Sequence, residues 1–137
     1  MKVFLDPGAY IPTRSHPTDA GLDIRSRETK MVPARGSAVF ETGVHIELPR
    51  GYAGFIKSKS GLNVNNGIVS EGVIDEGYQG QIIVKLYNHS DDDYKVMAGD
   101  KLTQLIVTRV SYVDVNVVNE FTKNTSRGSN GIGSTGR

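Results

Sequence analysis

The chain has 137 residues, with 16 lysines and arginines against 15 aspartates and glutamates, and no cysteine. This length suits one domain with a single core. The lack of cysteine excludes disulfides, thiolate nucleophiles and cysteine-based zinc sites, and a formal net charge of +1 argues against broad binding to nucleic acid. We therefore expect any anionic ligand to be small and locally bound.

Segments with period-2 alternation, bounded by Gly, Pro, Asn or Asp, dominate the chain, and helical periodicity is almost missing. In the clearest segment, residues 81–88, Ile82, Val84 and Leu86 share one face. In chain order, strands are predicted over residues 38–40, 44–48, 52–57, 81–88, 94–97, 101–110 and 112–118. Many short strands at this spacing predict an all-β fold, as a sandwich, jelly roll or barrel.

No apolar run approaches the roughly 20 residues of a membrane-spanning helix. We therefore expect no membrane partner and a cytoplasmic location. The three histidines, His16, His45 and His89, are scattered without the spacing of metal ligands, and each is interpreted as a structural or surface residue.

The last residues change character. After Asn119 the strand pattern stops, and residues 122–137 are polar and rich in glycine, so we predict a β domain over residues 1–121 and a flexible arm over 122–137. Glycine N–H groups can surround an anion, Ser134 and Thr135 add hydroxyl donors, and Arg127 adds a planar charged fork. From composition alone, a disordered polar tail explains this segment equally well.

Two upstream segments could take part in phosphate chemistry. Asp23 lies between apolar neighbours in a predicted strand, where it is either a site carboxylate or an outward-pointing or turn-capping residue. Residues 57–62, Lys-Ser-Lys-Ser-Gly-Leu, follow a strand with hydroxyls, lysines and a glycine, which suits phosphate binding by Ser60 and the adjoining amides. A helix N-cap at Ser60 explains this segment nearly as well and is compatible with an anion site.

Two further segments carry acid–base or amide groups. Residues 72–80 form an apolar strand that delivers Asp75 and then a tight turn that presents Tyr78; Asp75 is either a general base or an aspartate that opens a hairpin turn. Gln104 interrupts an apolar strand, so it is a network residue or a ligand contact. No serine–histidine pair or thiol accompanies these residues, which favours attack by a carboxylate-activated water over a covalent intermediate.

In this order, the segments resemble the five motifs of the homotrimeric dUTPase family over nearly the whole chain, from residue 20 to residue 136. The residues that match, in motif order, are Asp23, Ser60, Asp75 with Tyr78, Gln104 and the glycine-rich arm. The resemblance implies a jelly-roll or distorted-barrel subunit and a homotrimer whose active sites are shared between subunits.

The resemblance also implies the reaction, which is magnesium-dependent hydrolysis of dUTP to dUMP and pyrophosphate. Such a reaction lowers dUTP and supplies dUMP for dTTP synthesis. By resemblance, Asp75 would deprotonate the water that attacks the α-phosphorus. Mg²⁺ would be bound mainly through the substrate phosphates, and Asp23 would touch it only through water.

Substrate contacts follow from the same resemblance. Tyr78 would pack against deoxyribose and leave no room for a 2′-hydroxyl, and main-chain groups around residues 68–73 would read uracil. The substrate-binding residues assigned in this way are Lys59, Ser60, Gly61, Val69, Gly72, Val73, Ile74, Tyr78, Ile83, Gln104, Arg127, Gly131, Ile132, Gly133, Ser134 and Thr135.

Three residues depart from the family's pattern. Ile132 stands where the family usually has an aromatic residue that stacks on uracil, Lys59 stands where arginine is usual, and Asn130 replaces a frequent glycine. Isoleucine lacks a π face and lysine lacks the bidentate fork of arginine. The departure at Ile132 predicts a less firmly closed arm and slower turnover, and none of the three changes the predicted reaction class.

Other functions fit parts of the sequence. A dCTP deaminase relative would need an acid at C4 of the pyrimidine, for which Glu71 is the one nearby candidate, whereas the Asp75–Tyr78 motif favours dUTP hydrolysis. A phage-type homologue that regulates a protein partner would suit a weakly closing arm. A purely structural jelly-roll protein would not need five ordered motifs.

Overall fold

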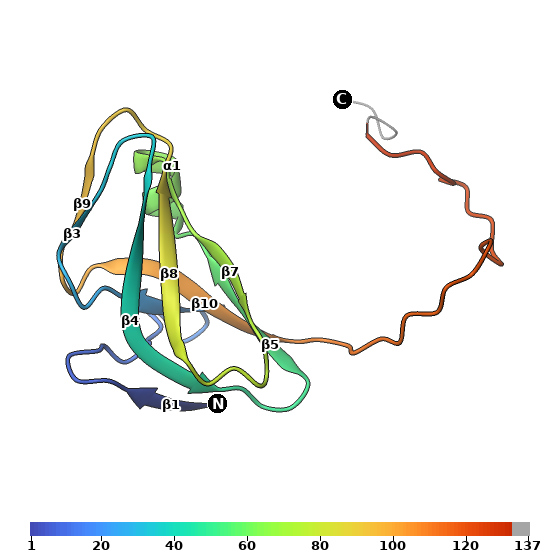
Figure 1. Ribbon diagram of the computed structural model, residues 1–137, viewed down its shortest axis with the longest axis horizontal. Helices are drawn as coiled ribbons and strands as arrows, with labels where there is room; N and C mark the ends of the chain where they lie inside the picture. Colours follow the sequence, from blue (N-terminus) through green and yellow to red (C-terminus); the bar gives the residue numbers. More distant parts are fainter. Residues whose placement is uncertain (133–137) are drawn as a thin grey trace.

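The computed structural model describes residues 1–132. In chain order its strands are β1 (Lys2–Leu5), β2 (Gly21–Arg25), β3 (Lys30–Val32), β4 (Ser37–Glu47), β5 (Tyr52–Lys57), β6 (Ile68–Val69), β7 (Glu71–Ile74), β8 (Gln81–Asn88), β9 (Tyr94–Val96) and β10 (Lys101–Arg109). One short helix, α1 (Ser60–Asn66), connects β5 to β6 (Figure 1).

Two four-stranded antiparallel sheets enclose the core. One has the strand order β1-β4-β8-β6 and the other β2-β10-β5-β7, while β3 and β9 form a separate two-stranded ribbon. A single cluster of buried side chains draws on both sheets, with Phe40 and Leu86 from the first and Ile24 and Leu105 from the second. This open, jelly-roll type arrangement confirms the predicted all-β fold class.

Strand β8 shows why the alternating pattern was informative. Its side chains alternate between buried and exposed, and Ile82, Val84 and Leu86 all point into the core. Strands β5 and β8 both have the predicted bounds. β8 alternates between buried and more exposed residues, as one face packed on the core requires, whereas β5 buries Ala53, Gly54 and Ile56 without strict alternation.

The two strands predicted over residues 38–40 and 44–48 are one strand, β4. The pairing of β4 with β8 shifts register between Glu41 and His45. Gly43 takes a positive φ of 65° at this bulge, and the buried hydroxyl of Thr42 donates to the carbonyl of Ile82 at 2.6 Å. A bulge bends a strand without ending it, so the predicted break was wrong.

The helix α1 begins one residue earlier than predicted. Its N-cap is Lys59, in an extended conformation and without a side-chain capping bond, and Ser60 is the first helical residue. The helix ends at Asn66, and its C-cap, Gly67, has a left-handed φ of 64°. Within residues 1–132, no helix has both the length and the apolar character needed to cross a membrane.

The strand predicted over residues 112–118 is wrong. Strand β10 ends at Arg109, and residues 110–132 leave the sheets without further helix or strand (Figure 1). Alternation specifies a strand-like pattern, but a strand also needs a neighbouring edge to pair with, and this segment pairs with no part of the described chain. The predicted boundary between residues 121 and 122 stays a prediction.

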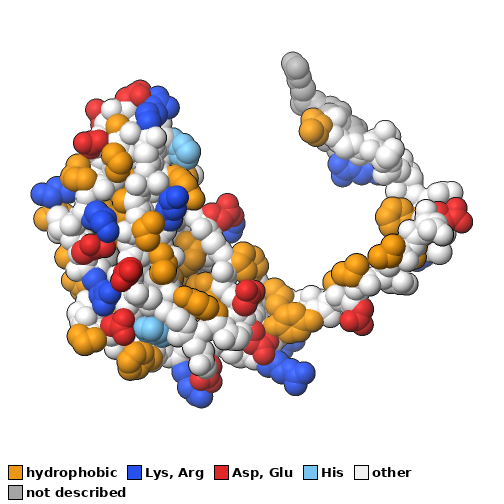
Figure 2. Space-filling model, in the orientation of Figure 1, with side chains coloured by type: hydrophobic (Ala, Val, Ile, Leu, Met, Phe, Trp, Pro, Cys, Tyr) orange, Lys and Arg blue, Asp and Glu red, His pale blue; other side chains and the backbone are white. Residues whose placement is uncertain are grey.

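Hydrophobic side chains line the start of this departing segment (Figure 2). Tyr112, Val113, Val115, Val117 and Phe121 are all 69% or more exposed. Apolar side chains gathered on one surface generally mark a contact site.

Candidate active site

Strand β10 places three predicted site segments side by side. Gln104 lies opposite Asp23 of β2 on one side and opposite Lys57 of β5 on the other. On the far side of β5, β7 pairs with it and ends at Ile74, immediately before Asp75. Antiparallel pairing within one sheet thus gathers the segments that carry four of the five motifs.

Asp23 is held by two cations. It is 5% exposed, and its two carboxylate oxygens lie 2.6 Å from Nζ of Lys59 and 2.6 Å from Nζ of Lys101. The hydroxyl of Ser15 donates to the same carboxylate at 3.1 Å. Burial raises the pKa of Asp23, but the hydrogen bonds from Lys101 and Lys59 outweigh burial and leave its pKa below the usual range.

Buried hydroxyls hold the segment that follows β5. The Thr103 hydroxyl donates to the Lys57 carbonyl at 2.8 Å, so Ser70 Oγ, 2.8 Å from Thr103 Oγ1, must be the donor of that second bond. The hydroxyl of Ser58 bonds both the carbonyl and the N–H of Ser70. These bonds link β5, β7 and β10 directly before Lys59, so the predicted phosphate loop starts from a rigid point.

Gln104 lies directly over Gly21. Its side-chain amide donates to the Ser58 carbonyl at 3.1 Å, and its side chain fills the space that a Cβ on Gly21 would need. Such a Cβ would lie only 2.8 Å from Cβ of Gln104, closer than real Cβ contacts. Glycine at position 21 therefore allows the amide to lie between the Asp23 cluster and the loop at Ser58.

Asp75, the predicted general base, lines an apolar hollow. Asp75 is exposed and directly follows β7. The hollow has a volume of about 210 Å³ and is lined by Ile56, Gly72, Val73, Ile74, Asp75, Tyr78, Ile82 and Ile83. Six of the predicted site residues therefore meet here, and Val69 lies nearby in the sheet order, on β6 beside β8.

Tyr78 has a defined position in the turn after Asp75. Its backbone N–H donates to the Asp75 carbonyl at 3.1 Å, and its hydroxyl donates to the Gln81 carbonyl at 2.9 Å. A Cβ on Gly80 would lie 2.6 Å from Cζ of the Tyr78 ring. Glycine at position 80 thus leaves room for the ring, which stays 44% exposed beside the hollow.

The arm is not gathered with these residues in the single chain. Arg127 bonds the Asn130 carbonyl at 3.0 Å within a local turn, and Gly131 and Ile132 are exposed. Gly133, Ser134 and Thr135 lie outside the described residues. Among residues 110–132, Tyr112 contacts the turn that follows Asp75, donating its hydroxyl to Glu76 at 2.5 Å.

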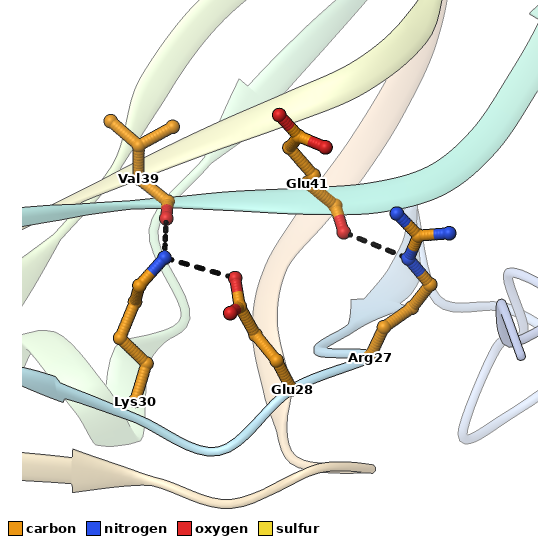
Figure 3. Close-up of a pocket in the computed structure, with 5 residues that line it drawn as sticks. All are labelled: Arg27, Glu28, Lys30, Val39 and Glu41. Carbon is orange, nitrogen blue, oxygen red and sulfur yellow. Dashed lines mark hydrogen bonds and ion pairs between the residues drawn. The ribbon is translucent and has the colours of Figure 1, made fainter.

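A second surface hollow, of about 470 Å³, lies between residues 27–30 and β4 (Figure 3). Nζ of Lys30 lies 3.0 Å from a carboxylate oxygen of Glu28 and 2.8 Å from the Val39 carbonyl. Arg27 Nε bonds the Glu41 carbonyl at 3.1 Å. The charges of Arg27 and Lys30 are balanced by those of Glu28 and Glu41. Because Lys30 Nζ and Arg27 Nε already bond protein oxygens, we do not expect this hollow to bind a polyphosphate.

Comparison with known proteins supplies the family. The dUTPase family model matches residues 8–136. The deoxyuridine 5'-triphosphate nucleotidohydrolase of Arabidopsis thaliana is 43% identical over 96% of this chain and 80% of its own length, and that of Candida albicans is 37% identical over 100% of this chain and 88% of its own. The chain belongs to the dUTPase family.

Solved dUTPase structures agree with this fold. The Staphylococcus bacteriophage 80alpha dUTPase with dUpNHpp has a TM-score of 0.93 at 30% identity, covering 99% of this chain and 98% of that one. A mutant dUTPase from phage phi11 of S. aureus, described with a structural Mg(II) ion, has a TM-score of 0.81 at 30% identity, covering 88% of this chain and 97% of that one.

Several residues that contact the candidate site were not identified from the sequence. Lys101 reaches Asp23 from a strand far along the chain, Ser15 reaches it from the loop before β2, and no spacing rule connects these residues. Gly21 carried a usable signal, because a glycine inside a predicted strand often marks a close approach, and Gly21 shares a strand face with Asp23 at period 2. The role of Thr103 could not be read, since its partners depend on strand register.

Magnesium is the ion that the dUTPase resemblance implies. Within residues 1–132, no three acidic or histidine side chains group together as a metal cage. Asp23 is a single carboxylate beside two lysines, a setting unsuited to direct coordination of a bare ion. It suits an ion that arrives with its own waters and with substrate oxygens as ligands.

The hydroxyl bonds at Thr103 predict a specific stability loss. Thr103→Val should lower the free energy of unfolding by about 1–3 kcal/mol, because it leaves the Ser70 hydroxyl and the Lys57 carbonyl without their partner. Thr108→Val, on the exposed end of the same strand, should change it by less than about 0.5 kcal/mol. Urea unfolding at one protein concentration measures both, and equal effects would contradict the network.

The contact between Gly21 and Gln104 predicts coupled substitutions. Gly21→Ala should lower the free energy of unfolding by about 1–3 kcal/mol through overpacking. In a Gln104→Gly background the same change should be nearly neutral, since the obstructing side chain is gone. Gly77→Ala is the control, because a Cβ there meets open space. Additive effects of the Gly21 and Gln104 changes would show that the two residues do not compete for space.

Proposed function

We propose that this chain hydrolyses dUTP to dUMP and pyrophosphate, through attack on the α-phosphorus by a water that Asp75 activates. One observation carries the proposal: Asp75 and Tyr78 line an apolar hollow that β5 joins directly to the loop of Lys59 and Ser60. Relatives named deoxyuridine 5'-triphosphate nucleotidohydrolase support it. The reaction lowers dUTP and provides dUMP for dTTP synthesis.

The nucleoside occupies the hollow between β7 and β8. Uracil meets the main chain of Gly72 and Val73, whose fixed donors and acceptors match its edge and leave cytosine with unpaired groups. The Tyr78 ring packs against deoxyribose, and a 2′-hydroxyl would collide with it. Ile83, 54% exposed on the neighbouring strand, covers the apolar side of the ligand.

The triphosphate extends toward the start of α1. Ser60 and Gly61 offer a hydroxyl and backbone N–H groups, and the Gln104 amide lies on the adjacent strand. Lys59 contributes a compact positive charge where the family usually has arginine. In the free chain this charge is paired with Asp23, so ligand phosphate and Asp23 compete for it.

Magnesium supplies charge neutralisation on the phosphate chain when it is bound. Substrate phosphates and waters would hold the ion, and Asp23 would reach it only through such a water. Asp75 acts separately as the base. It is exposed at a strand end, where it can accept a proton from a water placed in line with the α-phosphorus.

Three copies of the chain share each site. The exposed apolar side chains of residues 112–121 (Figure 2) support assembly, since they have no cover within the described chain. The arm of one copy then closes over a site built by others. Arg127, Gly131 and Ile132, together with Gly133, Ser134 and Thr135, are assigned to this closure.

A substrate panel tests the function. With magnesium, the chain should release pyrophosphate from dUTP and not from dCTP, dTTP or UTP, and Asp75→Asn should reduce the rate by about 10²–10⁴-fold through loss of the base. Ammonia release from dCTP would instead support the deaminase alternative. Retained dUTP binding without turnover would refute hydrolysis and favour a regulatory protein.

Substitution of Ile132 tests whether the arm closes over uracil. Ile132→Phe should raise kcat about two- to tenfold, the rate equivalent of the roughly 0.5–1.5 kcal/mol that aromatic pairing adds beyond buried area. Ile132→Leu, which adds no π face, should leave kcat near the parent value. An unchanged or lower kcat for Ile132→Phe would count against stacking as the missing interaction.

Mixed subunits test the shared site. Asp75→Asn and Arg127→Ala chains, each inactive alone, should regain about one quarter of parent activity when they are unfolded together in equal amounts and refolded. A site is active only if the chain that supplies residue 75 has its aspartate and the chain that supplies the arm has its arginine, and each condition is met about half of the time. Light scattering should give about three times the 14.9 kDa chain mass. No recovery in the mixture would mean that each arm closes on its own chain.

A regulatory role is the second candidate. Staphylococcus phage 80alpha dUTPase, to which this chain is similar at a TM-score of 0.93, is described as controlling transfer of virulence genes by a proto-oncogenic G protein-like mechanism. For this chain, such a role would use the ligand-dependent position of the arm as the signal to a protein partner. The substrate panel separates the two candidates.

A further inference from the structure

The chain contains two asparagine–glycine pairs, Asn66-Gly67 and Asn130-Gly131, and each is followed by isoleucine. Local sequence is therefore the same over three residues. Their structural settings differ, which makes the pair an internal comparison of one chemical reaction in two environments.

The reaction is spontaneous deamidation. The backbone nitrogen of the glycine attacks Cγ of the asparagine side chain, ammonia leaves, and a five-membered succinimide forms. Water then opens the ring at either carbonyl and gives aspartate or isoaspartate, so the balance is one water consumed and one ammonia released. Glycine favours the step because it has no Cβ to restrict the backbone angles that the attack requires.

At Asn66-Gly67 the attacking nitrogen is restrained. Gly67 is the C-cap of α1, with φ of 64° and ψ of 20°, and its N–H bonds the Asn63 carbonyl at 3.0 Å. The Gly67 carbonyl accepts the N–H of His89 at 3.0 Å. The helix end would have to open before Gly67 could turn toward the side chain of Asn66.

At Asn130-Gly131 the surroundings are open. Both residues are exposed and lie outside any helix or strand. The hydrogen bonds of this turn join the N–H of Asn130 to the Arg127 carbonyl at 3.0 Å and Arg127 Nε to the Asn130 carbonyl at 3.0 Å. These bonds use the backbone of Asn130 and hold neither its side chain nor the nitrogen of Gly131.

We propose that Asn130 is a site of spontaneous deamidation that Asn66 is not. The product places a carboxylate beside Arg127, whose guanidinium is already bonded to residue 130. If the arm closes on a triphosphate, a consequence that rests on the proposed function, this carboxylate repels the phosphates and competes for Arg127. Isoaspartate also adds a methylene to the backbone before Gly131 and Ile132.

Peptide mapping of the intact full chain tests the modification directly. After incubation at 37 °C and mildly alkaline pH, mass spectrometry should find aspartate and isoaspartate at position 130 at least about tenfold faster than at position 66, because reaction at Asn66 must first break the cap bond of Gly67. Gly131→Ala should slow the change at position 130. Equal rates at the two asparagines, or faster change at Asn66, would overturn the proposal.

Two further measurements test its consequence. A non-hydrolysable dUTP analogue with magnesium should slow deamidation at position 130 and leave position 66 unaffected, whereas an unchanged rate would contradict closure of the arm around residue 130. Asn130→Asp should raise KM for dUTP, with Asn130→Ser as the uncharged control. Peptide mapping measures deamidation without any turnover of dUTP. The proposed modification can therefore be confirmed or rejected even if the chain does not hydrolyse dUTP.

Discussion

The pairing of β10 with β2 and β5 is the constraint on which the site depends. Gln104 faces Asp23 on one neighbour and Lys57 on the other, and β7 continues the sheet to Asp75. A one-residue slip of β10 would turn Gln104 to the other face of the sheet and remove Thr103 from its hydroxyl bonds. Packing of Leu102 and Leu105 in the core opposes that slip, so burial of apolar side chains also sets the geometry of the polar ones.

The charges around Asp23 leave the free site with a net positive charge, because one carboxylate pairs with both Lys59 and Lys101. Removing either lysine would take away one of the two ion pairs that stabilise this largely buried carboxylate. In the proposed function, a bound triphosphate would bring several negative charges to the same lysines. Cations already ordered near Ser60 before substrate arrives would reduce the reorganisation that binding requires.

Sequence patterns predicted the all-β fold and the bounds of β5 and β8, and in β8 the alternation reports directly on one buried face. They could not show that β4 continues through a bulge. In the sequence Thr42 and Gly43 look like a turn, and only the folded structure shows that Thr42 bonds the Ile82 carbonyl on the neighbouring strand. Asp75 and Tyr78 were predicted from their motif, and both line the same hollow. Lys101 and the role of Gly21 were not, because they act through contacts between strands far apart in the chain. Ser15 was not either, because its contact with Asp23 depends on how the loop before β2 folds.

In the proposed reaction, one water activated by Asp75 attacks the α-phosphorus of dUTP. The most direct test is a single-turnover reaction in ¹⁸O-labelled water with enzyme in excess, followed by mass spectrometry of both products. Attack at the α-phosphorus predicts that the label appears in dUMP and that pyrophosphate stays unlabelled. Label in pyrophosphate would place the attack on the β-phosphorus and contradict the assigned geometry of Asp75.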